Sequence, residues 1–413
     1  MMKQERKISI VTTALFAAFV LVFSILFFIL PDKQISDTER RSLTQSPELT
    51  WKTLTDGTFS DRVNEYFNDQ FPLRETFLGI KAFFERALLK RENNGVLIGS
   101  GGQLAVRLFQ ATDGGIHVDE NGDYVLPSYT DKFYESNISA QFKALGDLQT
   151  SLAEKGVPLY VILPPRTVDV ACSALYYPNE NSDSLIACVR ENAKGLEHFI
   201  DMYDIYRARY DNGEYVYYKT DHHWTTLGAY YAYAELCKAM GKTPKARDEF
   251  TVHTATEDFI GTTAAKAGLL GAGGDVIEYW TANDRSNTGV KVQITNNLKG
   301  ENKASYDSMF DLSFVDGYDK YGLFLSGTNV YTDIRHNTKQ GYGKALLLKD
   351  SFGHSLAPFL ACEYDLTVLN LADLGRLQIS ADEYECVFVC FNLENLITTS
   401  NLLLLKYAPK FVK

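Results

Sequence analysis

Hydrophobic and polar positions set the first thirty residues apart from the rest of the chain. Ile8 to Leu30 is a run of 23 residues without a charge, and three basic residues precede it. A helix of this length can cross a bilayer. The basic flank predicts a cytoplasmic N-terminus, with everything after Asp32 outside the membrane. We predict an uncleaved single-pass anchor at 1–31 in the cell membrane, although a cleaved signal sequence or a buried helix fits the same pattern.

Residues 32–130 are predicted to be a tether followed by a packing segment. Ser36 to Trp51 is polar and is expected to be extended, whereas Phe59 to Leu89 has apolar residues at helical spacing. Pro72 lies inside that pattern, and proline removes a helical hydrogen bond. One helix is therefore expected before Pro72 and another after it.

Residues 131–413 show continuous apolar runs that alternate with helical patterns. Strands are predicted at 157–163, 198–202, 345–348, 366–369 and 386–391, and helices at 133–154, 185–196, 225–240 and 353–362. Runs that are apolar throughout are typical of strands covered on both faces, and their alternation with helices favours an α/β domain with a mostly parallel sheet. The stretch 241–340 is richer in Gly, Thr, Asn and Asp, so we expect a β-rich insertion there.

The charge balance excludes one class of partner. The chain has 413 residues and a formal net charge of −11. Nucleic-acid-binding proteins need clustered Lys and Arg against the phosphates, and the sequence has no such cluster. We therefore expect no nucleic-acid partner.

Six cysteines are compatible with disulfides in an exported protein but do not require them. Cys172 and Cys188 flank a predicted loop and are the better candidates for a bridge. Cys386 and Cys390 lie in a predicted strand, where cysteine behaves as a small apolar residue. The sequence has no CxxC spacing, so we expect no structural zinc site.

Candidate catalytic residues occur in two distant segments. Asp221, His222, His223 and Trp224 stand before a predicted helix, and Ser351 stands between an apolar run and the next predicted helix. A carboxylate beside an imidazole fixes its tautomer and stabilises the imidazolium that forms when it takes a proton from serine. In an extended loop, residues two apart face the same side, so His222 is expected to face away. We predict serine acyl transfer, with Ser351 as nucleophile, His223 as base and Asp221 as its orienting partner.

Three neighbouring residues each have two interpretations. Arg166 follows the predicted strand at 157–163 and would hold an anionic group or pair with a surface acid. His354 would lie on a helix face near the site or act as the base. Trp224 would be a core residue or a platform for a sugar ring.

A metal site is the weakest alternative for the same residues. It would use Asp221, His222, His223 and Asp350 around a catalytic ion. Adjacent histidines in an extended loop point in opposite directions, which does not suit a common ion. We therefore expect neither a metal nor a nucleotide cofactor.

The chain resembles the DHHW family, which is named for the motif found here as Asp221 to Trp224. The similar segments are Tyr218 to Tyr231, Phe259 to Thr262, Phe324 to Asn329, and Lys349 to Leu360. That family is similar to alginate O-acetyltransferase-like proteins. The resemblance implies an SGNH-hydrolase-like three-layer sandwich in a permuted order, with the Asp-x-His block ahead of the serine.

The resemblance also implies a function and its partners. It implies an O-acetyltransferase that acetylates a cell-surface or secreted polysaccharide beside a membrane-bound O-acyltransferase, which carries acetyl across the bilayer. The family pattern places an aromatic, a small residue and an Asn after the serine, where this chain has Phe352, Gly353 and His354. The remaining candidates for contacts with substrate or oxyanion are Arg166, His222, Trp224, Gly327, Asn329, Lys349 and His354.

Two other functions fit the same sequence. A carbohydrate esterase uses the same triad but lets water remove the acyl group from serine. A noncatalytic scaffold or glycan-binding subunit of an envelope assembly would keep the motif as structure only.

Overall fold

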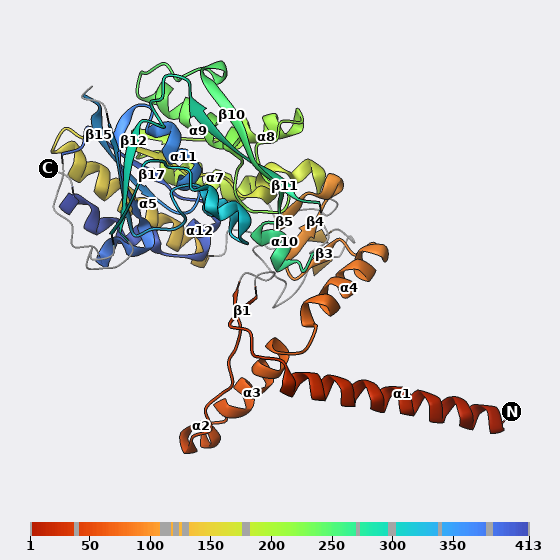
Figure 1. Cartoon of the computed structure of the whole chain (residues 1–413). Coiled ribbons are helices and arrows are strands. Elements are labelled where there is room, and N and C mark those ends of the chain that lie inside the picture. The colour runs from red at the N-terminus through yellow and green to blue at the C-terminus, as the bar shows by residue number, and fades with distance from the viewer. Residues whose placement is uncertain are drawn as a thin grey trace. The chain divides into compact units, whose positions relative to one another are not determined.

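The computed structural model describes residues 2–36, 41–107, 117–118, 124–125, 132–175, 182–269, 273–295, 303–337, 341–376 and 383–411 (Figure 1). The chain divides into two compact units. One comprises Met1–Lys90 with Gly268–Gly271, and the other comprises Arg91–Ala267 with Ala272–Lys413. The domain boundaries expected near residues 31 and 131 remain predictions.

The first unit is built around one long apolar helix. Its elements are α1 (Met2–Ile29), β1 (Ile35–Ser36), β2 (Arg41–Ser42), α2 (Trp51–Thr55), α3 (Thr58–Asp69) and α4 (Arg74–Ala87). Among the described residues, α1 is the one helix long and apolar enough to cross a membrane, with a mean hydropathy of 2.6 over Ser9–Ile29. A signal sequence passes the same test. The two helices predicted around Pro72 are confirmed as α3 and α4.

The second unit contains a mixed sheet of eight strands in the order β13-β12-β14-β16-β15-β17-β8-β9. Its strands are β8 (Leu159–Ile162), β9 (His198–Ile200), β12 (Val290–Thr295), β13 (Lys303–Tyr306), β14 (Tyr331–His336), β15 (Gly343–Lys349), β16 (Tyr364–Asn370) and β17 (Cys386–Cys390). The five strands from β16 to β9 run parallel, and β14, β12 and β13 extend that sheet antiparallel. The predicted α/β class with a mostly parallel sheet is confirmed.

Smaller elements surround the sheet. Further strands are β3 (Glu92–Asn93), β4 (Val96–Ile98), β5 (Leu104–Val106), β6 (His117–Val118), β7 (Tyr124–Val125), β10 (Phe250–Phe259) and β11 (Asp275–Ala282). The α-helices are α5 (Lys132–Ala153), α6 (Thr167–Val170), α7 (Ser182–Ala193), α8 (Tyr203–Asp211), α9 (Thr226–Ala239), α10 (Thr262–Lys266), α11 (Gly353–Leu360) and α12 (Leu393–Thr398). The 3-10 helices are η1 (Ser100–Gly102), η2 (Cys172–Ala174), η3 (Arg247–Glu249), η4 (Leu312–Asp316), η5 (Lys320–Leu323), η6 (Leu371–Arg376) and η7 (Asn401–Phe411).

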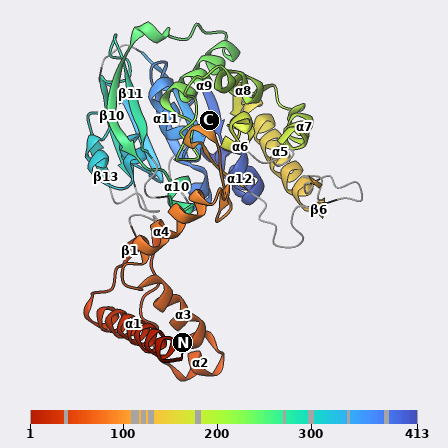
Figure 2. The ribbon, with the colours of Figure 1, turned by 90° about the vertical axis from the view of Figure 1, so that its right-hand side faces the viewer.

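Both faces of the sheet are buried, and β15 shows why. Successive side chains of a strand point to opposite faces. Ala345 and Leu347 join the cluster that includes α9 and α11, whereas Leu346 and Leu348 join the cluster that includes α5, α7 and α12. Figure 2 shows these two groups of helices on opposite sides of the sheet. A strand segment covered on both faces is expected to be apolar throughout, as Ala345 to Leu348 are in β15.

The stretch 241–340 is rich in strands, as expected from its composition. β10 and β11 form an antiparallel hairpin outside the main sheet. By contrast, β12, β13 and β14 belong to the main sheet. This stretch thus supplies three strands to the main sheet, and its status as an insertion stays a prediction.

Cys172 and Cys188, the better candidates for a bridge, do not form a disulfide, and neither do the four other cysteines. Cys172 begins η2, whereas Cys188 lies on α7 and packs against the apolar cluster beneath that helix. The amide of Asn192 lies within hydrogen-bonding reach of the Cys188 sulfur, at 3.7 Å.

Candidate active site

Ser351 lies in a tight turn between β15 and α11, and Asp350 holds this turn. One carboxylate oxygen of Asp350 accepts a hydrogen bond from the Phe352 N–H (3.0 Å). The other accepts from the Asn392 N–H (2.7 Å) and from the side-chain amide of Asn395 (2.8 Å). Asp350 therefore ties the serine turn to the start of α12 and orients the residue that follows it.

The segment that carries Asp221 and His223 is fixed at both ends. The buried carboxylate of Asp275 accepts from the Lys219 N–H (2.9 Å), from the Thr220 N–H (2.7 Å) and from the Thr220 hydroxyl (2.5 Å). The Tyr215 hydroxyl is a fourth donor to it. At the other end, Thr225 caps α9 by accepting from the Gly228 N–H. The loop is thus held by β11 on one side and by a helix on the other.

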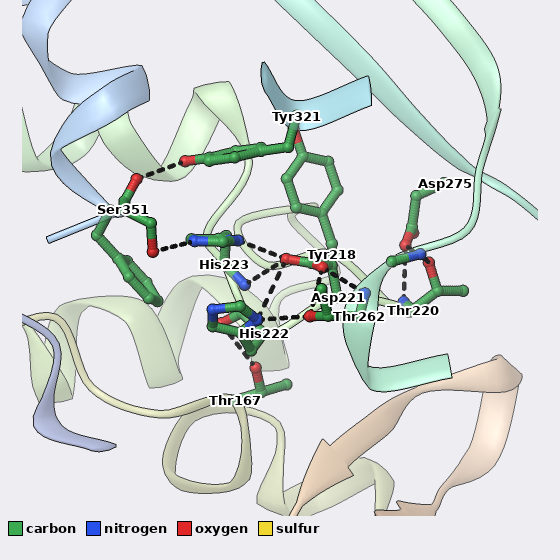
Figure 3. Close-up of polar contacts among 12 residues, drawn as sticks. Thr167, Tyr218, Thr220, Asp221, His222, His223, Thr262, Asp275, Tyr321 and Ser351 are labelled. Carbon is green, nitrogen blue, oxygen red and sulfur yellow. Dashed lines mark hydrogen bonds and ion pairs between the residues drawn. The ribbon is translucent and has the colours of Figure 1, made fainter. Parts of the chain in front are cut away.

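Ser351, His223 and Asp221 form one continuous hydrogen-bonded line (Figure 3). His223 Nε2 lies 2.7 Å from Ser351 Oγ, and His223 Nδ1 lies 2.5 Å from Asp221 Oδ1. An ionised carboxylate only accepts hydrogen bonds, so Nδ1 carries the proton and Nε2 accepts from the serine hydroxyl. This arrangement can deprotonate the serine.

Asp221 is buried but fully hydrogen-bonded. Its Oδ1 also accepts from the His223 N–H (3.0 Å), and its Oδ2 accepts from the N–H (2.7 Å) and hydroxyl (2.9 Å) of Thr262. Burial alone would raise the pKa of Asp221, but the charges of His222 and His223 and these hydrogen bonds outweigh it and hold the pKa well below its usual range. Asp221 is therefore ionised at neutral pH.

Gly261 leaves room for the Asp221 side chain. A Cβ at Gly261 would lie 2.2 Å from Asp221 Cβ and 2.6 Å from its Oδ2. We expect Gly261→Ala to displace the carboxylate, to destabilise the fold by about 1–3 kcal/mol, as overpacking does, and to lower activity. Urea unfolding and turnover assays of the variant measure both effects.

Gly146 in α5 provides the matched control, because nothing lies within 4 Å of a Cβ built there. We expect Gly146→Ala to stabilise the fold by about 0.5–1 kcal/mol, since alanine favours a helix interior, and to leave activity unchanged. Equal behaviour of the two variants would contradict the role assigned to the space beside Gly261.

Two aromatic rings position His223. The Tyr321 ring stacks on it with a centroid distance of 4.1 Å and an angle of 12°, and the Phe352 ring lies at 4.8 Å. The Tyr321 hydroxyl lies 3.0 Å from Ser355 Oγ and 3.4 Å from the Ser351 carbonyl oxygen. These contacts restrict rotation of the imidazole, so its two nitrogens remain directed at Ser351 and Asp221.

The expectation that His222 faces away from Asp221 is wrong. The rings of His222 and His223 lie side by side with centroids 3.9 Å apart, and His222 Nδ1 is 3.6 Å from Asp221 Oδ1. It also lies 2.8 Å from the Thr262 hydroxyl. Residues 219–223 bend rather than extend, so the alternation of a strand does not apply. Burial and the nearby His223 lower the pKa of His222.

Three of the four residues considered for a metal site are close together. Asp221, His222 and His223 can bring ligand atoms within 4.8 Å of one another, but Asp350 is not part of this group. The Asp350 carboxylate is instead occupied by the turn around Ser351. Because both ring nitrogens of His223 are already hydrogen-bonded, an ion bound there would have to replace one of those bonds.

Arg166 and Trp224 are both buried. The Arg166 guanidinium is buried and donates to both carboxylate oxygens of the buried Asp169 (2.9 and 2.6 Å), so its partner is not a surface acid. Trp224 is fully buried, and its indole N–H donates to Ser355 Oγ (2.8 Å). Trp224 is therefore a core residue, and it cannot stack on a sugar ring.

His354 lies on α11 near the site, whereas His223 makes the bond to Ser351. His354 is buried, and among the described residues its Nε2 has no hydrogen-bond partner. Burial, together with the charges of Lys349 and His223, holds its pKa well below the usual range. His354 is therefore neutral at neutral pH.

Gly327 and Asn329 lie in a loop with an unusual backbone. Leu325, Ser326 and Gly327 have φ values of 59°, 55° and 79°, so three successive residues adopt the left-handed conformation. The Asn329 amide donates to the carbonyls of Leu325 (2.7 Å) and Gly327 (3.3 Å) and so stabilises this loop. A role for either residue at the oxyanion stays a prediction.

Lys349 precedes the turn that carries Ser351 and is buried at the end of β15. Burial lowers its pKa from 10.5 to about 8, against the opposing effect of Asp350. At pH values between these two pKa values, the Lys349 side chain is protonated in the unfolded chain and neutral in the folded chain. The free energy of unfolding therefore rises with pH. Relative to Lys349→Met, we expect the wild-type free energy of unfolding to rise by about 3 kcal/mol over this window. Urea unfolding at several pH values checks this, and parallel curves would contradict it.

Sequence reasoning missed Thr262 as a partner of Asp221, and it missed Tyr321 and Asp275 entirely. Tyr321 stands in a short 3-10 helix without a recognisable pattern, and only the fold brings it to His223. Asp275 follows Gly273 and Gly274 at the start of a strand, where an acidic residue is uncommon. An acidic residue at the start of a strand was therefore the signal in the sequence that could have identified Asp275.

Comparisons with known proteins show the family and the fold of this chain. The family model described as DHHW protein matches residues 118–369. No curated protein matches the chain. Two solved structures have the same fold. A DHHW family protein from Eubacterium siraeum is 17% identical with a TM-score of 0.54, covering 76% of this chain and 95% of that chain. Bacillus cereus PatB1 is 21% identical with a TM-score of 0.53, covering 67% and 94%.

PatB1 has also been solved with a sulfonyl adduct, and that structure matches with a TM-score of 0.54 at 21% identity, covering 67% of this chain and 93% of that chain. Identities at this level show a shared fold. The family model, however, spans more than half of the present sequence and includes the Asp221 to Trp224 motif. The chain therefore belongs to the DHHW family.

Proposed function

We propose that this protein is a membrane-anchored, extracytoplasmic O-acetyltransferase that acetylates hydroxyl groups of a cell-surface or secreted polysaccharide. The observation that carries the proposal is the hydrogen-bonded line from Ser351 through His223 to Asp221. The two-sided sheet, with the Asp-x-His block ahead of the serine, fits a permuted SGNH-type three-layer sandwich. The match to structures of this fold supports that assignment.

The proposed reaction has two half-reactions. Ser351 Oγ attacks the carbonyl carbon of an acetyl donor while His223 Nε2 takes its proton, and the imidazolium then protonates the leaving group. In the second half-reaction, His223 removes the proton from an acceptor hydroxyl, which attacks the acetyl-serine. The bond between the acetyl group and Ser351 Oγ breaks, and the imidazolium returns the proton to Ser351 Oγ. Asp221 stabilises the imidazolium in both.

The proposed location requires a donor outside the cytoplasm. If α1 anchors the protein with the rest of the chain outside, the acetyl group must cross the bilayer first. We therefore propose a membrane-bound O-acyltransferase as the partner that delivers it. The reaction as written uses Ser351, His223 and Asp221 and requires no metal.

Product analysis tests transfer against hydrolysis. The full chain in detergent is incubated with an activated acetyl ester and a polysaccharide fragment, and the products are separated by mass spectrometry. Acetylated fragment above the level found with Ser351→Ala supports the transferase. Free acetate as the sole enzymatic product would contradict transfer and favour a carbohydrate esterase.

A further inference from the structure

The first unit exposes a stripe of large apolar side chains along α4. The stripe consists of Phe77, Ile80 and Phe84 within α4 and of Leu88 directly after it, which follow one another at intervals of three or four residues. Such spacing places them on one face of a helix. Each is at least 39% exposed, and Leu88 is 81% exposed. Contiguous exposed apolar surface of this kind marks a contact with a partner or a membrane.

Aromatic contacts place the start of this stripe beside the apolar part of α1. Phe77 and Phe71 lie 5.6 and 5.4 Å from Phe23, and Phe67 stacks on Phe27 at 4.6 Å (ring centroids). Phe23 is six residues before the end of the apolar helix at Ile29. At 1.5 Å per residue, it lies about 9 Å inside that end. Phe71 and Phe77 therefore lie beside residues that a bilayer would surround.

Polar contacts just beyond α1 fix the position of these helices along it. Gln70 accepts from the Lys33 N–H (3.0 Å) and donates to the Lys33 carbonyl (2.9 Å). The Tyr66 hydroxyl donates to Asp32 (3.0 Å). Polar contacts are thus made with residues 32–33, and aromatic contacts with residues 23–27. This order matches the change from water to hydrocarbon at the surface of a bilayer.

We propose that the α4 stripe lies in the outer interface of the lipid bilayer, so that α3 and α4 form a second membrane contact beside α1. The occupant is lipid because the stripe is continuous with the side chains that touch the proposed anchor inside its apolar span. Aromatic side chains at a helix face favour such an interface. The proposal rests on the membrane anchor of the proposed function.

A tryptophan at position 84 tests the contact. The chain has three tryptophans, of which Trp224 and Trp280 are buried and Trp51 is 81% exposed. The full-length variant Trp51→Phe/Phe84→Trp is reconstituted in phosphatidylcholine vesicles that carry bromine on the acyl chains near the headgroups. We expect the added emission to shift to the blue, to be quenched by the brominated lipid and to be protected from aqueous iodide. Trp51→Phe alone supplies the background.

Trp51→Phe/Tyr318→Trp is the matched control, since Tyr318 is 48% exposed on the second unit. Its emission should respond to iodide and not to brominated lipid. The proposal is overturned if the position-84 tryptophan is quenched by iodide, or if it is shielded from iodide without being quenched by lipid, which would indicate a protein contact. Release of the chain from vesicles at alkaline pH would also overturn it, by removing the anchor.

Acetyl labelling of Ser351 in the same vesicles separates this proposal from the catalytic one. Labelling without lipid quenching at position 84 contradicts the membrane contact alone. Quenching without labelling supports the contact and contradicts the catalytic assignment alone.

Discussion

Replacing Ser351 with alanine abolishes the acetyl-enzyme and lowers the turnover number by about 10⁶-fold, the size of the loss when the serine of a protease triad is removed. Among the described residues, no hydroxyl other than that of Ser351 forms a hydrogen bond with His223 Nε2. The fold should tolerate the change, because Ser351 is only half-buried and alanine is smaller. Mass spectrometry of the intact chain after incubation with an activated acetyl ester measures the acetyl-enzyme.

Ser355→Ala is the control for this prediction. Ser355 is buried on α11 and bonds to Trp224 and Tyr321, but it does not contact His223 Nε2. We expect this variant to lose about 1–3 kcal/mol of stability, because it leaves a buried N–H without its partner, and still to form the acetyl-enzyme. An acetyl-enzyme that survives Ser351→Ala and disappears in Ser355→Ala would contradict the assignment.

Replacing Asp221 with asparagine lowers the turnover number by about 10⁴-fold, as in triads whose aspartate is replaced in this way. The carboxylate accepts from His223 Nδ1, which leaves Nε2 free to accept from Ser351. An asparagine that donates its N–H to Nδ1 would favour the other tautomer, with the proton on Nε2. Steady-state kinetics of the variant at neutral pH measures the loss.

Thr262→Val is the control variant for Asp221→Asn. It removes the hydroxyl donor to Asp221 Oδ2 but leaves the Thr262 N–H in place. One hydrogen bond to a charged group contributes about 1.5–3 kcal/mol, so the loss of activity should be far smaller than that of Asp221→Asn. If Asp221→Asn retained activity within tenfold of wild type, the orienting role of Asp221 would be wrong.

Local patterns in the sequence were sufficient to predict the five parallel strands of the central sheet and to select the residues of the hydrogen-bonded line. The run at 345–348 is apolar at every position because it is covered on both faces, and it became β15. Asp221, His223 and Ser351 could be selected because their residue types have a known chemical relationship. The fold then brings Ser351 to His223.

Long-range pairing was beyond the reach of these patterns. The stretch 241–340 has short apolar runs and many turn residues, which describe strands but not their neighbours in a sheet. β14 pairs with β16, so the position of β12 and β13 depends on a contact with residues far along the chain. The strand propensity of these residues does not determine which strand they pair with.

Predictions of side-chain direction were wrong where the backbone is irregular. His222 was placed opposite His223 on the assumption of an extended loop, but residues 219–223 bend around the Asp275 carboxylate. The Arg166–Asp169 pair, by contrast, was readable at i,i+3 at the start of a helix, where an acidic residue is favoured. The two interpretations considered for Arg166 were an anionic group and a surface acid, and its partner here is the buried Asp169.

Peptide mapping of the acyl adduct in wild type and in His223→Ala tests the central claim most directly. Both proteins are treated with an activated acetyl ester and, separately, with a sulfonyl fluoride, and the modified residue and its rate of formation are determined by mass spectrometry. The account predicts a single adduct on Ser351 in wild type and a much slower reaction at the same residue in His223→Ala. An adduct on another residue, or an unchanged rate without the imidazole, would contradict it.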